Sequence, residues 1–177
     1  MRSAGEGGPA GTRPPGVMPA GTGIELQRRF RASPDRVFRA WTEPAALREW
    51  WSPPGWIAGA IEIDLRPEGC YRIEMRPIGG GERVAIHGMF LEITPPRRLV
   101  YTWIWEGAFA KTAPTLVTVE IDGSKDETLL TLRHENFAQP GSREQHRTGW
   151  IAACNRLDRL ITPIPEPYVP SALPSAD

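Results

Sequence analysis

The sequence contains few of the residues that build metal or redox centres. Its 177 residues include two cysteines and three histidines. Cys70 and Cys154 lack the paired spacing of a redox motif, and two thiols alone cannot complete a zinc site. The histidines show neither the H-E-x-x-H pattern nor a spacing of four on a helix. We therefore expect no metal and no cofactor, and we expect both thiols to be small core residues.

The sequence also lacks an excess of one charge and a long apolar run. Lys and Arg number 21, Asp and Glu number 21, and the pI is about 6.8. A balanced charge argues against a nucleic-acid-binding surface and against a polybasic membrane-binding face. No stretch approaches the ~20 apolar residues of a membrane helix, and prolines interrupt every candidate signal segment near the start. These absences predict a cytoplasmic protein with no nucleic-acid and no membrane partner.

Glycine and proline are abundant, but they are unevenly distributed. The 18 Gly and 19 Pro make up about a fifth of the chain, against an average near 12%. Residues 1–23 and 163–177 hold seven of the glycines and nine of the prolines, whereas all seven Trp lie between these segments. We expect a disordered first tail and an extended, Pro-rich second tail. Residues 24–162 are then expected to form a single domain.

Between the tails, the apolar residues follow the periods of strands and short helices. Residues 24–31 alternate as a first strand, and Ser33-Pro34 and Glu43-Pro44 are typical starts of two short helices. Short strands joined by turns then predict an antiparallel meander, with a bulge near Gly88 where the apolar phase slips. Alternation places the later strands at residues 61–66, 71–76, 84–94, 99–105, 117–121 and 130–134.

The last element is expected to be the longest helix. Ser142 and Gln145 have the spacing of a capping box, and apolar residues from Trp150 onward repeat at helical spacing. Gly149 within the helix indicates a close backbone approach, and His146 in its first turn is expected to be exposed. One amphipathic helix packed on one face of a curved sheet would bury both apolar surfaces, so the class is α+β.

Four motifs in a recognisable order resemble a known family. They are DLRPEG at residues 64–69, GMFLEITPPRRLVYTWIW at 88–105, TLLTLRH at 128–134, and Gly149-Trp150. Together they resemble the START-like SRPBCC superfamily, in the branch named for similarity to the heat-shock-protein-90 ATPase activator. The resemblance covers nearly all of the predicted domain and neither tail. It implies a helix-grip (START- or Bet v-like) fold, an antiparallel sheet curled around the C-terminal helix with a cavity between them.

Aromatic residues are the most informative candidates for a binding site. A buried aromatic ring removes ~150–250 Å² from water, whether it belongs to a core or to a cavity wall. In the resembled fold, the short helices lie near the mouth of the cavity. The expected lining combines the ends of these helices, alternating strand faces, two histidines and one Trp of the last helix: Trp50, Trp51, Trp56, Tyr71, Ile73, Met75, His87, Tyr101, Trp103, Trp105, His134 and Trp150.

Three functions are compatible with these residues. The leading hypothesis is a domain that binds a small hydrophobic or aromatic molecule without catalysis. No nucleophile and no pair of acidic residues has the sequence spacing that is typical of a catalytic site. One alternative is a cyclase- or dehydratase-like enzyme with His87, His134 or Tyr101 as acid or base. Another, suggested by the resemblance, is an interaction module that stimulates a chaperone ATPase. The sequence leaves a homodimer open.

Overall fold

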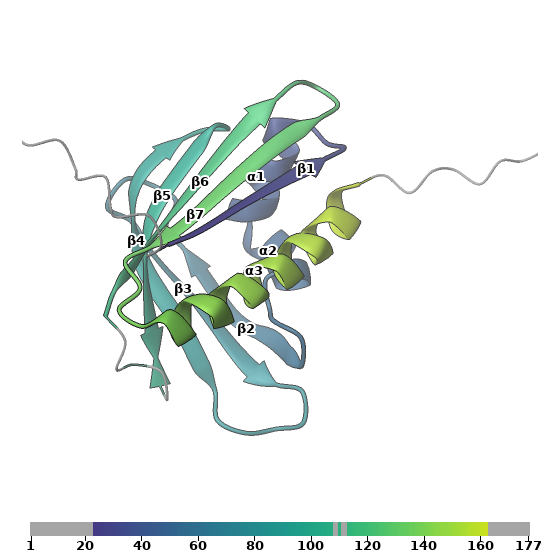
Figure 1. The fold of residues 1–177 in the computed structure, drawn as a ribbon. Helices are drawn as coiled ribbons and strands as arrows, with labels where there is room; N and C mark the ends of the chain where they lie inside the picture. The colour runs from purple at the N-terminus through teal and green to yellow at the C-terminus, as the bar shows by residue number, and fades with distance from the viewer. Residues whose placement is uncertain (1–22, 108–109, 111–112, 163–177) are drawn as a thin grey trace, which may run out of the picture.

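Seven strands and three helices make up the described part of the chain, which comprises residues 23–107, 110 and 113–162 of a computed structural model (Figure 1). The two predicted tails lie outside these residues, apart from Gly23. The order of elements confirms the predicted α+β class and the two short helices after the first strand. In chain order they are β1 (Ile24–Phe30), α1 (Pro34–Thr42), α2 (Pro44–Trp50), β2 (Trp56–Ile63), β3 (Cys70–Pro77), β4 (Val84–Thr94), β5 (Arg98–Glu106), β6 (Thr115–Gly123), β7 (Thr128–Glu135) and α3 (Pro140–Ile161).

The strands form one antiparallel sheet in the order β1-β7-β6-β5-β4-β3-β2. From β2 to β7 each strand pairs with the next, as a meander requires, whereas β1 pairs with β7, with Ile24 opposite His134. Figure 1 shows the sheet curled, with α3 lying along its concave side. α3 contacts β1, α1 and α2, so the two short helices complete the wall beside it. This is the helix-grip arrangement.

The starts of α1 and α3 show which local sequence signals correctly predicted where a helix begins. Ser33 caps α1 as predicted, because its Oγ accepts a hydrogen bond of 3.3 Å from the backbone N–H of Arg36. The capping box predicted at Ser142 is wrong. α3 begins at Pro140, after an extended Gln139 that provides no side-chain cap. Proline is pre-organised for the first helical position, so Ser142 already lies inside the helix.

The predicted close approach at Gly149 is wrong, whereas a bulge does occur near the predicted position. A Cβ on Gly149 would meet no atom within 4 Å, so its predicted close approach is wrong. Close approach occurs instead at Gly88, where a Cβ would collide with the carbonyl oxygen of Thr102 and the ring of Tyr71. The predicted bulge is two residues further on, between Phe90 and Glu92.

The two cysteines have different environments. Cys154 on α3 is buried, as expected, but Cys70 at the start of β3 is exposed, so its assignment to the core is wrong. Cys70 precedes the buried Tyr71 by one position, and alternation along a strand therefore directs it to the opposite face. No helix among the described residues is long and apolar enough to span a membrane.

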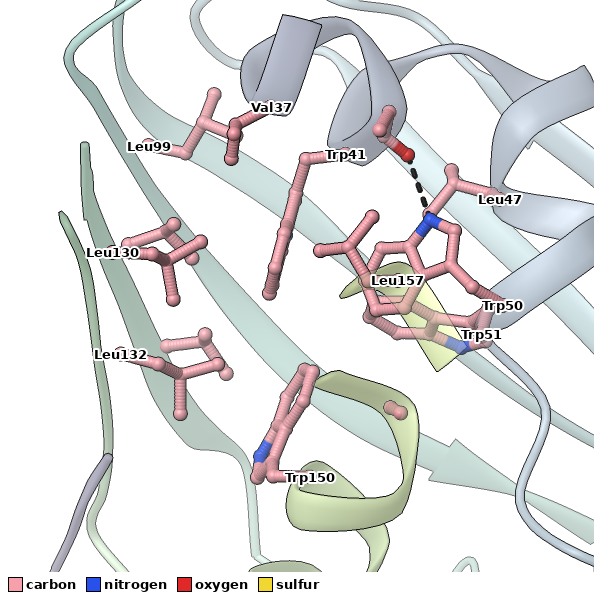
Figure 2. Close-up of a cluster of buried hydrophobic side chains, with 14 of the residues drawn as sticks. Val37, Trp41, Leu47, Trp50, Trp51, Leu99, Leu130, Leu132, Trp150 and Leu157 are labelled. Atoms are coloured by element: carbon pink, nitrogen blue, oxygen red, sulfur yellow. Dashed lines mark hydrogen bonds between the residues drawn. The ribbon is translucent and has the colours of Figure 1, made fainter. Parts of the chain in front are cut away.

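The core lies between the concave face of the sheet and the three helices. Figure 2 shows Trp41 of α1 reaching between the sheet residues Leu130 and Leu132 on one side and Leu157 of α3 on the other. All three leucines are fully buried, and burial of a leucine side chain contributes about 1.5–3 kcal/mol. α3 is therefore held mainly by its apolar face.

Leu157→Ala is expected to lower the free energy of unfolding by about 2–5 kcal/mol, because it leaves a cavity between α3 and the sheet. Leu160→Ala on the same helix is the matched control. Leu160 is 39% exposed, so its loss should change stability by no more than about 0.5 kcal/mol. Urea denaturation followed by circular dichroism measures both. Equal losses in the two variants would contradict this account of the core.

Candidate functional site

Most of the predicted lining residues lie together on the concave side. Trp56 and Trp105 are half-buried and pack against this core. His87 is the exception, because it lies opposite Arg72 on the convex face, between the buried Ile86 and Gly88. The remaining residues are buried in one cluster: Trp50, Trp51, Tyr71, Ile73, Met75, Tyr101, Trp103, His134 and Trp150.

Five indoles form the centre of this cluster. The ring centroids of Trp41 and Trp50 are 4.7 Å apart, and those of Trp51 and Trp103 are 5.6 Å apart. Trp150 lies 5.3 Å from both Trp51 and Trp103. Trp41, which was not among the predicted lining residues, stacks on Trp150 at 6.0 Å with an interplanar angle of 18°. The rings that were expected to line a cavity thus pack directly against one another.

Trp50 and Trp41, both on the short-helix side of the cluster, donate hydrogen bonds inside it. Trp50 Nε1 donates to the carbonyl oxygen of Ala40 over 2.8 Å, the dashed line in Figure 2. Trp41 Nε1 donates to the Tyr101 hydroxyl over 3.2 Å. Burial raises the pKa of Tyr101 far above its usual 10.0, and also raises that of Tyr71. Both phenols are therefore protonated at neutral pH.

A chain of hydrogen bonds fixes the protonation of His134. Trp150 Nε1 donates to His134 Nδ1 over 3.0 Å, so Nδ1 is the acceptor nitrogen. Nε2 then carries the proton and donates to Thr115 Oγ1 over 2.8 Å, and Thr115 donates to the carbonyl oxygen of Trp103 over 3.3 Å. Every polar group of this chain is satisfied when His134 is neutral.

His146 forms a second series of hydrogen bonds at the start of α3. Its Nδ1 donates to the carbonyl oxygen of Ser142 over 2.7 Å, so its Nε2 is free to accept from Trp105 Nε1 over 3.1 Å. The prediction that His146 is exposed is wrong, because the side chain is half-buried. It lies four residues before Trp150, and that spacing places both side chains on one helix face. This signal could have identified His146 from the sequence.

The rings of His134, His146 and Phe137 form a triangle of direct neighbours. The ring centroids of His134 and His146 are 5.0 Å apart, and Phe137 lies 4.5 Å from the first and 5.0 Å from the second. Burial, followed by the neighbouring His146, lowers the pKa of His134 well below 6.5. Burial also lowers the pKa of His146, against the opposing effect of its bond to Ser142. Both imidazoles are therefore neutral at pH 7.

One buried donor in the cluster has no acceptor. Trp103 is 7% exposed, and its Nε1 makes no hydrogen bond within the described residues. Its ring lies between Trp51, Trp150 and His134. Leaving a buried N–H unsatisfied costs about 1–3 kcal/mol. Within the described residues, this cluster of rings therefore contains a buried donor without an acceptor.

The outer surface of the described residues includes two hollows. The convex-face hollow measures about 510 Å³ and is lined by polar residues that include His87, Arg72 and Glu106. Arg72 binds the Glu106 carboxylate through Nε at 3.1 Å and Nη2 at 2.8 Å, which lowers the pKa of Glu106. The α2–α3 hollow measures about 330 Å³ and lies between α2, the start of β2 and Arg156 of α3.

The structure separates the residues that were considered for catalysis. His87 lies on the convex face, whereas His134 and Tyr101 lie on the concave side. Both ring nitrogens of His134 are engaged by Trp150 and Thr115.

No group of three or more His, Cys, Asp or Glu side chains in the described residues could hold a metal ion.

Lowering the pH from 7.5 to 5.5 is expected to reduce the free energy of unfolding. The unfolded chain takes up protons near the ordinary histidine pKa of 6.5, whereas His134 and His146 resist protonation in the folded state. Stability should therefore fall below about pH 6.5, by at most ~1.4 kcal/mol per pH unit for each histidine. Urea denaturation at several pH values measures the slope.

His146→Gln removes one of these titrating groups and should reduce the slope over the same range. A stability that rises as the pH falls from 7.5 to 5.5 would show that the neutral states assigned to the two histidines are wrong.

Comparison with known proteins agrees with this fold. A protein of Chromobacterium violaceum is 28% identical, with a TM-score of 0.73 over 81% of this chain and 99% of that one. A protein of Nitrosomonas europaea is 25% identical, with a TM-score of 0.68 over 81% and 96%. The AHSA1 protein of Silicibacter pomeroyi, at 23% identity and a TM-score of 0.68 over 78% and 96%, shares the fold.

No curated protein matches the chain. Residues 31–162, however, match the family described as "Activator of Hsp90 ATPase homolog 1-like protein". The match begins in the turn after β1 and ends just beyond α3, so it includes both short helices and the concave side with its aromatic cluster. The chain therefore belongs to the AHSA1-like family, as its motifs indicated.

Proposed function

We propose that this AHSA1-like protein binds a small, flat, largely apolar molecule with a hydrogen-bond acceptor on the concave side of its sheet, without catalysing a reaction on it. The observation that carries this proposal is the buried Trp103 N–H, which has no acceptor among the described residues. An acceptor atom of a bound molecule would remove the cost of that unsatisfied group.

The surroundings of Trp103 suit a flat molecule. Trp51, Trp105 and Trp150 lie within 5.9 Å of its ring, centroid to centroid, and offer both ring faces and ring edges. Aromatic contacts of this kind contribute about 0.5–1.5 kcal/mol beyond the area they bury. The N–H would then select among molecules of similar shape, because a site with a buried donor disfavours an analogue that lacks the acceptor.

The least buried end of the cluster is the place where it would open. Trp105, Phe137 and His146 are half-buried, unlike the indoles behind them. The bond between Trp105 and His146 joins β5 to α3 at this end. Since the rings already touch, a ligand would have to turn at least one of these side chains aside. We infer that entry occurs between β5 and the first turns of α3.

Catalysis is less well supported by the geometry. A general base needs a free nitrogen or oxygen directed at the substrate, but both nitrogens of His134 are occupied and the pKa of Tyr101 is raised. Stimulation of a chaperone ATPase is the alternative that the family name suggests, and an ATPase assay with added protein would test it.

Wild-type protein is expected to bind 2-acetylnaphthalene about tenfold more tightly than 2-ethylnaphthalene, which has a similar shape but no acceptor. The Trp103 indole N–H resonance should move on binding of the ketone. Titrations followed by ¹H–¹⁵N spectra measure both the affinity and the position of the ligand.

Trp103→Phe should abolish the preference for the ketone, because it removes the donor and keeps an aromatic ring. Leu160→Ala, at an exposed residue of α3 outside this cluster, is the control and should keep the preference. Equal binding of the two compounds to the wild type, or an unmoved Trp103 resonance, would show that the proposal is wrong.

A further inference from the structure

The α2–α3 hollow is separate from the aromatic cluster and has a different chemistry. Its volume of about 330 Å³ is at the lower end of the range for small-molecule sites, roughly 300–1,000 Å³. Trp56, together with the prolines of the loop before it, provides apolar wall, and Arg48 and Arg156 provide two positive charges. Glu49, exposed on α2, is the one carboxylate among its lining residues, so cations outnumber anions there.

Arg156 is a half-buried cation that has no carboxylate partner within the described residues. Its Nε donates to the carbonyl oxygen of Trp50 over 2.9 Å, and its Nη2 donates to that of Ser52. These bonds satisfy carbonyl groups at the end of α2. Burial, and then the charge of Arg159, lowers the pKa of Arg156. Arg156 therefore carries its charge in a partly desolvated position, and no carboxylate of the described residues neutralises it.

The bonds to α2 use only one edge of the guanidinium. Arginine has two edges that can bind a planar anion through paired N–H groups. The Nε–Nη2 edge is occupied by the two carbonyl oxygens, whereas Nη1 makes no hydrogen bond within the described residues. The Nη1–Nη2 edge is thus available to a carboxylate in the hollow that Arg156 lines.

A second unsatisfied polar group lies beside it. Ser52 also lines the hollow, and the residue is only 8% exposed. Its Oγ has no hydrogen-bond partner among the described residues. An unpaired buried hydroxyl costs about 1–3 kcal/mol. Because this oxygen is enclosed, the Ser52 side chain would have to turn toward the hollow to meet a bound oxygen, which would relieve that cost and pair the Arg156 charge at the same time.

We propose that the α2–α3 hollow binds the carboxylate of a small, flat, apolar acid, with the carboxylate on Arg156 and Ser52 and the apolar body against Trp56. The bidentate fork of Arg156 suits a planar carboxylate. The apolar wall favours an organic acid over a free inorganic anion. This site does not depend on the binding proposed beside Trp103.

The test uses the full chain with 2-naphthoate and its uncharged amide, 2-naphthamide, as probes. Naphthoate is expected to bind at least about tenfold more tightly than naphthamide, since hydrogen bonds to charged groups are the stronger kind. The resonances of the Trp56 indole N–H and the Arg156 Nε–H should shift on binding. Equal affinity for the two probes would overturn the proposal.

Arg156→Gln should weaken naphthoate binding by at least about tenfold, because it removes the charged fork. Arg159→Gln is the matched control. It removes the same charge from the same helix at an exposed residue that does not line the hollow, and binding should stay within about twofold. Equal losses in both variants would mean that only overall charge matters and would overturn the proposal.

Ser52→Ala covers the case in which Arg156→Gln fails to fold without its bonds to the end of α2. The serine hydroxyl has no partner in the described structure, so its removal should leave the melting temperature unchanged or raise it. Naphthoate binding should weaken severalfold. Unchanged affinity would overturn the proposal. So would a shift of the Trp103 resonance without one at Trp56, which would assign the probe to the aromatic cluster instead.

Discussion

The burial of Trp150 against three other indoles is the contact on which the arrangement of the molecule depends. Its ring stacks on Trp41 of α1 and meets Trp51 and Trp103 at 5.3 Å, and its N–H donates to His134 of β7. One side chain of α3 therefore contacts α1, the residue after α2, β5 and β7. A curled sheet exposes a broad apolar face, and Trp150 holds α3 over that face beside α1 and α2.

The polar atoms inside this core distinguish structural residues from candidate ligand contacts. Trp41, Trp50 and Trp150 all donate to protein acceptors. The Trp103 N–H and the Ser52 hydroxyl are buried without partners in the described residues. Native proteins leave few such groups unsatisfied. We therefore base the two binding proposals on these atoms, since ring packing alone explains a core as well as it explains a cavity wall.

Local signals in the sequence predicted the helices and strands more accurately than they predicted the burial of single residues. Alternation and the Ser33 cap predicted the first strand and first helix. Cys70 and His146 were assigned wrongly, for opposite reasons. Cys70 faces outward because its neighbour Tyr71 faces inward. His146 is half-buried because it bonds to Trp105, which lies about forty positions earlier in the chain. Alternation could have avoided the first error, and the four-residue spacing of His146 and Trp150 could have indicated that His146 faces the core. The bond from Trp105 to His146 is long-range, and local spacing could not have predicted it.

The sequence by itself determined the order of the elements, the α+β class and the family. These follow from local periodicity and from short motifs, which can be recognised along the chain without knowing any tertiary contact. Only the tertiary structure decided that β1 pairs with β7 and that the aromatic residues of the predicted lining pack ring against ring. Those outcomes depend on which distant residues meet when the sheet curls, and side-chain spacing along the chain carries no record of that curvature.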